Sequence, residues 1–109
     1  MRLGNDTGDF YDVEVTDEID MPEGFQLVMT CMSCPEQYDM FYRGIQCAYF
    51  RLRGGRFTVT MPSVEGELVY MHHWEDDTYK GNFDTDDERE EHMSAAIREV
   101  VEYLRKGRR

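Results

Sequence analysis

Apolar and polar residues alternate in several short runs of this chain, and the alternation predicts strands. In residues 10–16, FYDVEVT, aromatic and valine side chains share one side while acids share the other, as expected for a half-buried strand. The run 25–32, FQLVMTCM, is apolar enough for a second strand, buried on both faces. Pro35 ends it, because proline lacks the N–H that a ladder needs. We therefore expect N-terminal strands within residues 10–32.

The clearest pattern surrounds Gly54-Gly55, where CAYFRLR and RFTVTM flank a two-residue turn. Glycine readily takes the positive φ angles of tight hairpins. The expected cross-strand pairs are Arg53–Arg56, Leu52–Phe57, Phe50–Val59 and Ala48–Met61. Every apolar pair then falls on one face, and a slip by one residue would bury arginines. The opposite face receives Cys47, Tyr49, Arg51, Arg53, Arg56, Thr58 and Thr60.

Two further strands extend this hairpin into a meander over residues 37–72. The run QYDMFYR joins it through Gly44, and we expect a three-residue loop from Arg43 to Ile45. That loop predicts the pairs Met40–Ala48 and Tyr38–Phe50. After the turn PSVEG, the run ELVYM (67–71) makes a fourth meander strand.

The last element is a helix over residues 85–106. Thr85-Asp-Asp-Glu88 matches a capping box, in which both side chains satisfy free N–H groups. Acids at the start and basic residues at the end suit the helix dipole. One apolar stripe follows helical spacing: Met93, Ile97, Val100, Val101 and Leu104.

Together these elements predict one domain spanning residues 1–109. It belongs to the α+β class: an antiparallel β-meander of about four to six strands, with the C-terminal helix packed on its apolar face. An acidic loop at 73–84 connects the sheet to the helix.

One resemblance rests on residues 34–71. The CPEQYD block, the YFRLRGGRFTV hairpin and a following VY strand, with a helix after an acidic segment, resemble a family of small uncharacterised proteins of bacteria and their phages or mobile elements. The family carries no activity that transfers. The resemblance therefore implies a fold and a mobile-element setting only.

Composition narrows the function. The chain has 109 residues, 40% hydrophobic, with 23 acidic against 12 basic side chains and a formal net charge of −11. That charge repels nucleic-acid phosphates and anionic membranes, and it favours a partner with a basic surface. The start of the chain lacks an apolar leader segment and no run is long enough to span a bilayer, so we expect a soluble, cytoplasmic protein of a bacterial host cell.

The segment 75–91 carries nine acids against Lys80 and Arg89. Its common interpretation is a solvated loop entering a helix. The alternative is a decoy for phosphates, in which aromatic anchors among the acids, including Phe83, contact a basic protein surface. The predicted partner-binding residues are Trp74, Asp76, Asp77, Tyr79, Asp84, Asp86 and Asp87.

The polar face of the hairpin is a second candidate. We call the surface of Tyr49, Arg51, Arg53, Arg56, Thr58 and Thr60 the arginine face. Cations beside an aromatic ring bind single-stranded RNA in other sheets. The simpler interpretation is that Asp12 and Glu14 of the N-terminal strand pair with these arginines.

The cysteines leave a third possibility open. Cys31 and Cys34 have CxxC spacing, and Cys47 with His72 or His73 would complete a four-ligand zinc site. A single CxxC is weak, however, and reduced cysteines at strand ends are the commoner outcome. The main interpretation is that no metal or other cofactor is bound.

We find no nucleophile motif and no phosphate-binding glycine loop. The sequence therefore predicts a non-enzymatic protein-binding module, a phage or mobile-element inhibitor or accessory factor that occludes a basic partner surface. An exposed sheet edge would also permit a homodimer.

Overall fold

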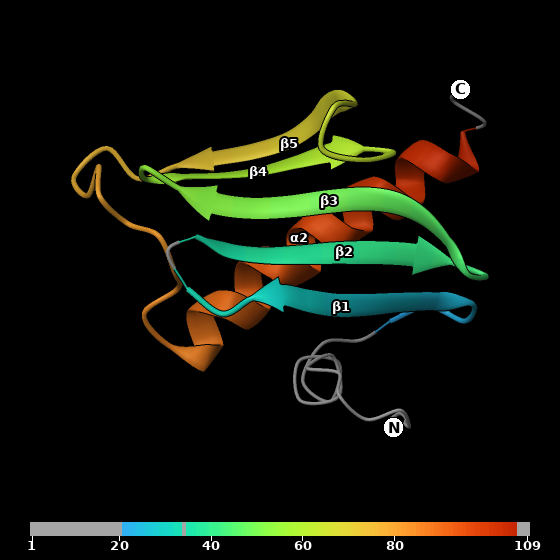
Figure 1. The fold of residues 1–109 in the computed structure, drawn as a ribbon, viewed down its shortest axis with the longest axis horizontal. Helices are drawn as coiled ribbons and strands as arrows, with labels where there is room; N and C mark the ends of the chain where they lie inside the picture. The colour runs from blue at the N-terminus through green and yellow to red at the C-terminus, as the bar shows by residue number, and fades with distance from the viewer. Residues whose placement is uncertain (1–20, 34, 107–109) are drawn as a thin grey trace.

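The computed structural model describes residues 21–33 and 35–106. Along the chain lie β1 (Phe25–Cys31), β2 (Glu36–Tyr42), β3 (Ile45–Arg53), β4 (Arg56–Met61), β5 (Glu67–His73) and α2 (Asp86–Arg105). The five strands form one antiparallel sheet in sequence order, and α2 crosses one of its faces (Figure 1). This is the predicted α+β architecture. The strand expected at 10–16 lies outside the described residues.

The hydrophobic core lies between one face of the sheet and one side of α2. Strand side chains alternate between faces, so the inward residues of β1 to β4 form a continuous apolar layer. Burying each large apolar side chain contributes about 1.5–3 kcal/mol before entropy is counted. The buried set includes Leu27, Tyr38, Met40, Ala48, Phe50, Leu52, Phe57, Val59 and Met61 from the sheet, with Met93, Ala96, Ile97 and Val100 from α2.

The β3–β4 hairpin has the predicted register. Gly54 and Gly55 form the turn with φ angles of 61° and 77°. The pairs Arg53–Arg56, Leu52–Phe57 and Phe50–Val59 are confirmed. The ladder ends at Tyr49–Thr60, one pair short of the expected Ala48–Met61.

The β2–β3 connection differs from the prediction. Tyr42 pairs with Ile45, so the turn has two residues, Arg43 and Gly44, with φ angles of 51° and 85°. Met40 still pairs with Ala48. The register shifts between Met40 and Phe41, which leaves Cys47 as an extra residue in β3. This β-bulge turns Cys47 into the core, where its side chain is buried. The prediction that Cys47 lies on the polar face was therefore wrong.

The two edge strands also depart from the expectation. β1 alternates, with Leu27 and Met29 inward and buried, so it is not buried on both faces. β5 runs to His73, two residues beyond the predicted end. A register shift between Val59 and Thr60 adds a bulge opposite β4.

The helix α2 begins as the capping box predicts. The Thr85 hydroxyl accepts a hydrogen bond from the Glu88 N–H at 3.0 Å, and Glu88 Oε1 accepts one from the Asp84 N–H at 2.6 Å. Most of the predicted stripe is buried. Leu104 is the exception at 36% exposure, because the last turn of α2 extends past the core.

Candidate functional site

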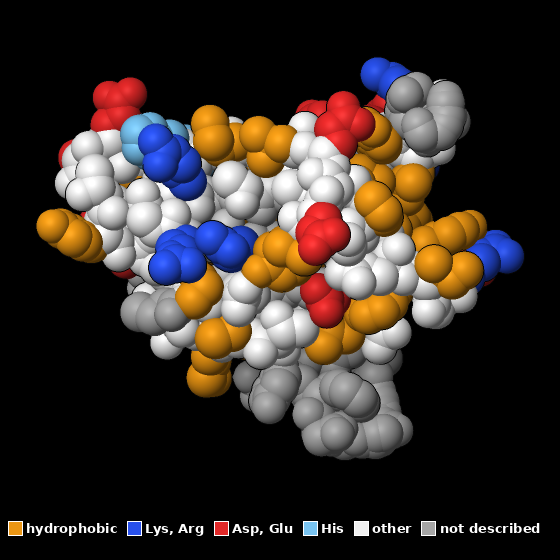
Figure 2. Space-filling model, turned by 45° about the horizontal axis from the view of Figure 1, so that its top comes forward, with side chains coloured by type: hydrophobic (Ala, Val, Ile, Leu, Met, Phe, Trp, Pro, Cys, Tyr) orange, Lys and Arg blue, Asp and Glu red, His pale blue; other side chains and the backbone are white. Residues whose placement is uncertain are grey.

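The arginine face is the sheet face opposite α2. Among the described residues no element packs over it, whereas α2 covers the opposite face (Figure 1). Figure 2 shows this face with basic side chains gathered on one part of it. The structure therefore brings the residues of the arginine face together, as their register predicts. Arg51 pairs with Thr58, Tyr49 with Thr60 and Arg53 with Arg56.

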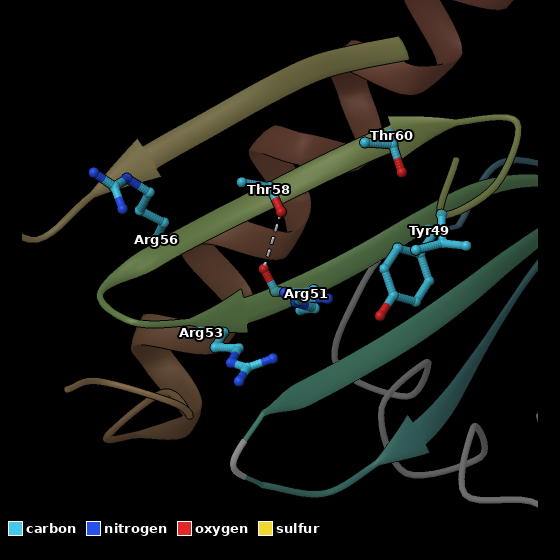
Figure 3. A pocket seen from close by; sticks show the side chains of 7 residues that line it. Tyr49, Arg51, Arg53, Arg56, Thr58 and Thr60 are labelled. Carbon is cyan, nitrogen blue, oxygen red and sulfur yellow. Dashed lines mark hydrogen bonds between the residues drawn. The ribbon is translucent and has the colours of Figure 1, made fainter. Parts of the chain in front are cut away.

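These side chains line a hollow of about 270 Å³ between β3 and β4 (Figure 3). Val64, from the loop before β5, completes the lining. The threonine hydroxyls donate to main-chain carbonyls, Thr58 to Arg51 at 3.5 Å and Thr60 to Ser63 at 2.7 Å. The Tyr49 hydroxyl donates to Gln37. The charged donors left in the hollow are therefore the guanidinium groups.

The arginines of this face lack described counter-charges. Within residues 21–33 and 35–106, no ion pair involves Arg51, Arg53 or Arg56. Arg53 and Arg56 also stand directly opposite each other, an arrangement of like charges that costs stability. The expected pairing with Asp12 and Glu14 falls outside the described residues. Such a cluster is suited to holding an anion, since guanidinium groups match carboxylate and phosphate oxygens.

The acidic loop, residues 74–84 in the structure, is held against the Gly54-Gly55 turn. The Gly55 N–H donates to the Lys80 carbonyl at 3.0 Å, and the Trp74 N–H donates to the Gly55 carbonyl at 2.8 Å. A Cβ at Gly55 would lie 2.6 Å from the Asp77 carbonyl oxygen. The loop therefore lies beside the turn that Arg53 and Arg56 of the arginine face flank, at one end of the sheet.

Several predicted partner-binding residues are engaged inside the molecule. Trp74 packs on the rings of His92 and Phe83, with centroids 4.9 and 6.1 Å away. Phe83 itself is buried in the core. These two aromatic rings are therefore not free anchors for a partner.

Two of the predicted acids are also neutralised locally. Asp84 Oδ2 lies 3.0 Å from the ammonium of Lys80, a buried lysine that also contacts Glu88 at 3.3 Å. Burial alone lowers the pKa of Lys80, but its hydrogen bonds to these carboxylates raise the pKa above its usual value. Asp86 pairs with Arg89 at 2.7 Å.

The remaining predicted residues stay available. Tyr79 is 92% exposed and lies next to the exposed acids of the loop tip. In the part of the chain that the structure describes, no ion pair involves Asp76, Asp77 or Asp87. The candidate acidic surface is therefore reduced to four residues: Asp76, Asp77, Tyr79 and Asp87.

Sequence reasoning missed a buried carboxylate. Glu36 is 1% exposed and accepts hydrogen bonds from the Arg89 Nε at 2.6 Å, the Phe83 N–H at 3.0 Å and the Tyr38 hydroxyl. Burial, with Glu36 alongside, raises the pKa of Tyr38, and the hydrogen bond to Glu36 raises that of Arg89. A signal was present, because alternation puts Glu36 on the same face as Tyr38. Its enclosure among protein donors indicates a structural role.

A pair of histidines borders the same region. The ring centroids of His72 and His92 are 4.6 Å apart, and His92 stacks on Phe83 at 5.8 Å. Burial, and then the nearby His72, lower the pKa of His92. His73 points to the other face, where it opposes Arg56.

Among the residues that the structure describes, the proposed zinc ligands do not lie together. Within the described residues, no group of three or more His, Cys, Asp or Glu side chains is placed to hold a metal ion. Cys31 lies opposite Gln37 near the start of β2, whereas Cys47 lies near its end. Burial raises the pKa of the Cys47 thiol to about 11, which disfavours the thiolate that zinc binds. Cys34 lies outside the described residues.

Comparison with protein families, curated proteins and solved structures finds no significant match to this chain. Within the described part of the chain, no helix has both the length and the apolar character needed to cross a bilayer.

Proposed function

We propose that this protein is a non-enzymatic protein-binding module that covers a basic surface on its partner. The observation that carries the proposal is the tip of the acidic loop, where the 92% exposed Tyr79 is flanked by Asp76 and Asp77, which form no ion pair with any residue that the structure describes. An exposed tyrosine supplies contact area at low entropic cost, and carboxylates around it steer a cationic partner.

The anchoring of the loop supports this role. Its main chain is hydrogen-bonded to the Gly54-Gly55 turn, and Lys80 fixes its far end. A loop held in this way loses little conformational entropy when it binds. The net charge of −11 supports fast association with a basic surface. The resemblance of residues 34–71 supports a phage or mobile-element setting only, and within that setting the role we propose is that of an inhibitor or accessory factor in the cytoplasm of a bacterial host.

The test is affinity capture from a bacterial lysate, followed by measurement of Kd for the recovered partner. The triple variant Asp76→Asn, Asp77→Asn, Tyr79→Ala should weaken binding by about tenfold or more, equal to about 1.4 kcal/mol. The double variant Glu90→Gln, Glu91→Gln removes the same charge from exposed positions on α2 and should bind as the native protein does. Equal affinity of the triple variant and the native protein would contradict the proposal.

A second candidate function is binding of single-stranded RNA on the arginine face. The specific observation in its favour is the uncovered hollow with three guanidinium groups that lack described ion-pair partners. Bases would stack on Tyr49 while phosphates meet the arginines.

Fluorescence anisotropy with a labelled single-stranded oligonucleotide tests this candidate. Binding should weaken with salt and be lost when Arg51→Ala and Arg53→Ala are combined. Arg98→Ala, an exposed arginine on α2, is the matched control. Binding that Arg98→Ala weakens as much as the paired change would indicate non-specific attraction.

A further inference from the structure

The hollow on the arginine face has two chemically different ends. Arg53 and Arg56 lie at the turn end of the hairpin, and Tyr49 and Thr60 form the last pair of the ladder at the other end (Figure 3). Val64 lines the hollow from the loop after β4. Tyr49 and Arg53 are four residues apart on β3, which corresponds to about 13 Å. A ligand that fills the hollow therefore meets cations at one end and an aromatic ring with an aliphatic side chain at the other.

The cationic end is suited to an oxyanion. Arg51 and Arg53 project from the same face of β3, because they are two residues apart. Arg56 stands across the turn, with its guanidinium group turned away from that of Arg53 (Figure 3). None of these arginines forms an ion pair with a residue that the structure describes. An oxyanion beside Arg51 and Arg53 would accept charge-assisted hydrogen bonds and reduce the repulsion between like charges.

The other end is suited to an apolar body. The hydroxyl of Tyr49 already donates to Gln37, so the ring of Tyr49 is the part left for a ligand. Val64 beside it is 55% exposed. Leu68 and Met71 of β5, 53% and 50% exposed, continue the apolar surface on the same face of the sheet. Apolar and aromatic side chains around a few charged groups are the usual lining of small-molecule sites.

Acidic side chains limit how far a ligand can extend beyond the hollow. Three exposed acids, residues 75–77, lie in the loop that is hydrogen-bonded to the turn. Exposed Glu65 follows Val64 at the other end, and Asp39 lies opposite Tyr49 on β2. Figure 2 likewise shows acidic side chains on both sides of the basic ones. A long polyanion would come within the screening length of these acids, about 8 Å, whereas a compact anion would end inside the hollow.

We propose that the hollow binds a small organic anion, no longer than about 13 Å, with an oxyanion at one end and an aromatic or aliphatic body at the other. Its carboxylate or phosphate contacts Arg51 and Arg53, and its body lies over Tyr49 and Val64. This ligand is an alternative to single-stranded RNA on the same surface, and the bordering acids favour the smaller ligand. It does not contact the tip of the acidic loop, so anion binding here and protein binding there succeed or fail independently.

Nuclear magnetic resonance titrations of the full chain with phenyl phosphate and with phenylacetate test the proposal. Either probe should shift the side-chain signals of Arg51 and Arg53, and the tighter one identifies the preferred head group. Inorganic phosphate and acetate lack the ring and should bind at least tenfold more weakly. Arg51→Gln with Arg53→Gln should weaken binding of the tighter probe at least tenfold. Arg98→Gln, which changes an exposed arginine on α2, should leave the affinity unchanged.

Val64→Ser tests the apolar end separately. It should weaken binding of the ring-bearing probe and leave inorganic phosphate unaffected, because the arginines remain. Circular dichroism should show an intact fold, since Val64 is exposed. The proposal would be overturned if neither probe shifted the arginine signals at about 10 mM. Equal loss of affinity in Arg98→Gln and the double variant, or native affinity in Val64→Ser, would also overturn it. So would a single-stranded oligouridylate that binds at least tenfold more tightly than both probes, an outcome that favours RNA.

Discussion

Glu36 shows how one side chain joins three parts of this protein. Its carboxylate lies on β2, while its donors come from the end of the acidic loop and from α2. The main-chain N–H of Glu36 also donates to the Gly81 carbonyl at 2.8 Å. A buried charge is tolerated only when it is paired and hydrogen-bonded. The docking of the helix start therefore depends on this carboxylate.

Replacing Glu36→Gln should lower the free energy of unfolding by about 3 kcal/mol, because it removes the buried carboxylate that pairs with the guanidinium of Arg89 and leaves only the exposed Asp86 as a counter-charge. Urea unfolding followed by circular dichroism measures the change. Glu90→Gln on the exposed side of α2 is the control and should shift stability by less than about 0.5 kcal/mol. A loss for Glu36→Gln as small as the control's would refute the structural role.

His92 should make stability depend on pH. Burial and His72 lower its pKa below the ordinary value of about 6.5. Lys80 also lowers this pKa, whereas Glu91 and Glu88 raise it by smaller amounts. The unfolded chain therefore binds the proton more readily than the folded one. Stability should be unaffected by this group above about pH 6.5 and should fall as the pH drops from there towards the lowered folded pKa.

The measurement is the urea midpoint at a series of pH values from about 7.5 to about 5, a span that brackets the histidine range. His92→Gln should flatten the dependence. His73→Gln, which changes an exposed ring on the other face of β5, should leave the native slope in place. If His92→Gln keeps the native dependence of the urea midpoint on pH, another group causes that dependence.

At the scale of elements, the β3–β4 hairpin was predictable because two local signals agree. Gly54-Gly55 sets the turn, and alternation sets which side chains lie inward. The β2–β3 connection was not predictable to the residue. Arg43 takes a positive φ, which few residues other than glycine adopt, and the bulge at Cys47 compensates for the shorter turn. A cysteine side chain is found on buried and on polar faces alike, so no local feature of the sequence predicted the bulge.

The candidate surfaces were predictable to a different degree. Alternation alone placed the arginine face together. The internal contacts of the acidic surface were not predictable. The ion pair of Asp84 with Lys80, and the ring contacts of Trp74 with His92 and Phe83, depend on how the loop folds back. Such contacts between distant segments leave no periodic mark in a sequence.

The turn that carries the acidic loop yields a matched pair of substitutions. Gly54→Ala and Gly55→Ala both place a Cβ on a residue with positive φ, at a cost of about 1–2 kcal/mol. At Gly54 the nearest atom to that Cβ is 3.9 Å away, whereas at Gly55 it is the Asp77 carbonyl at 2.6 Å. Thermal unfolding should therefore show Gly55→Ala to be the less stable by at least about 1 kcal/mol. Equal losses would mean that the loop does not rest on this turn.

At the scale of the whole molecule, the sheet and α2 share one core and neither can bury its apolar side alone. Unfolding should therefore be cooperative. Trp74, the single tryptophan, lies where the loop, β5 and α2 meet. Its fluorescence and the far-ultraviolet circular dichroism should give the same urea midpoint. Separate midpoints would show that the loop region unfolds on its own.

The hydrogen bonds between Gly55 and the acidic loop have a consequence for how any partner approaches. They hold the loop that carries Asp76 and Asp77 beside the turn that Arg53 and Arg56 flank. A uniformly cationic body is drawn to one side and pushed from the other, so it experiences a torque before it touches the protein. The angle of arrival is thereby restricted in advance, and bodies of opposite sign are rotated in opposite senses.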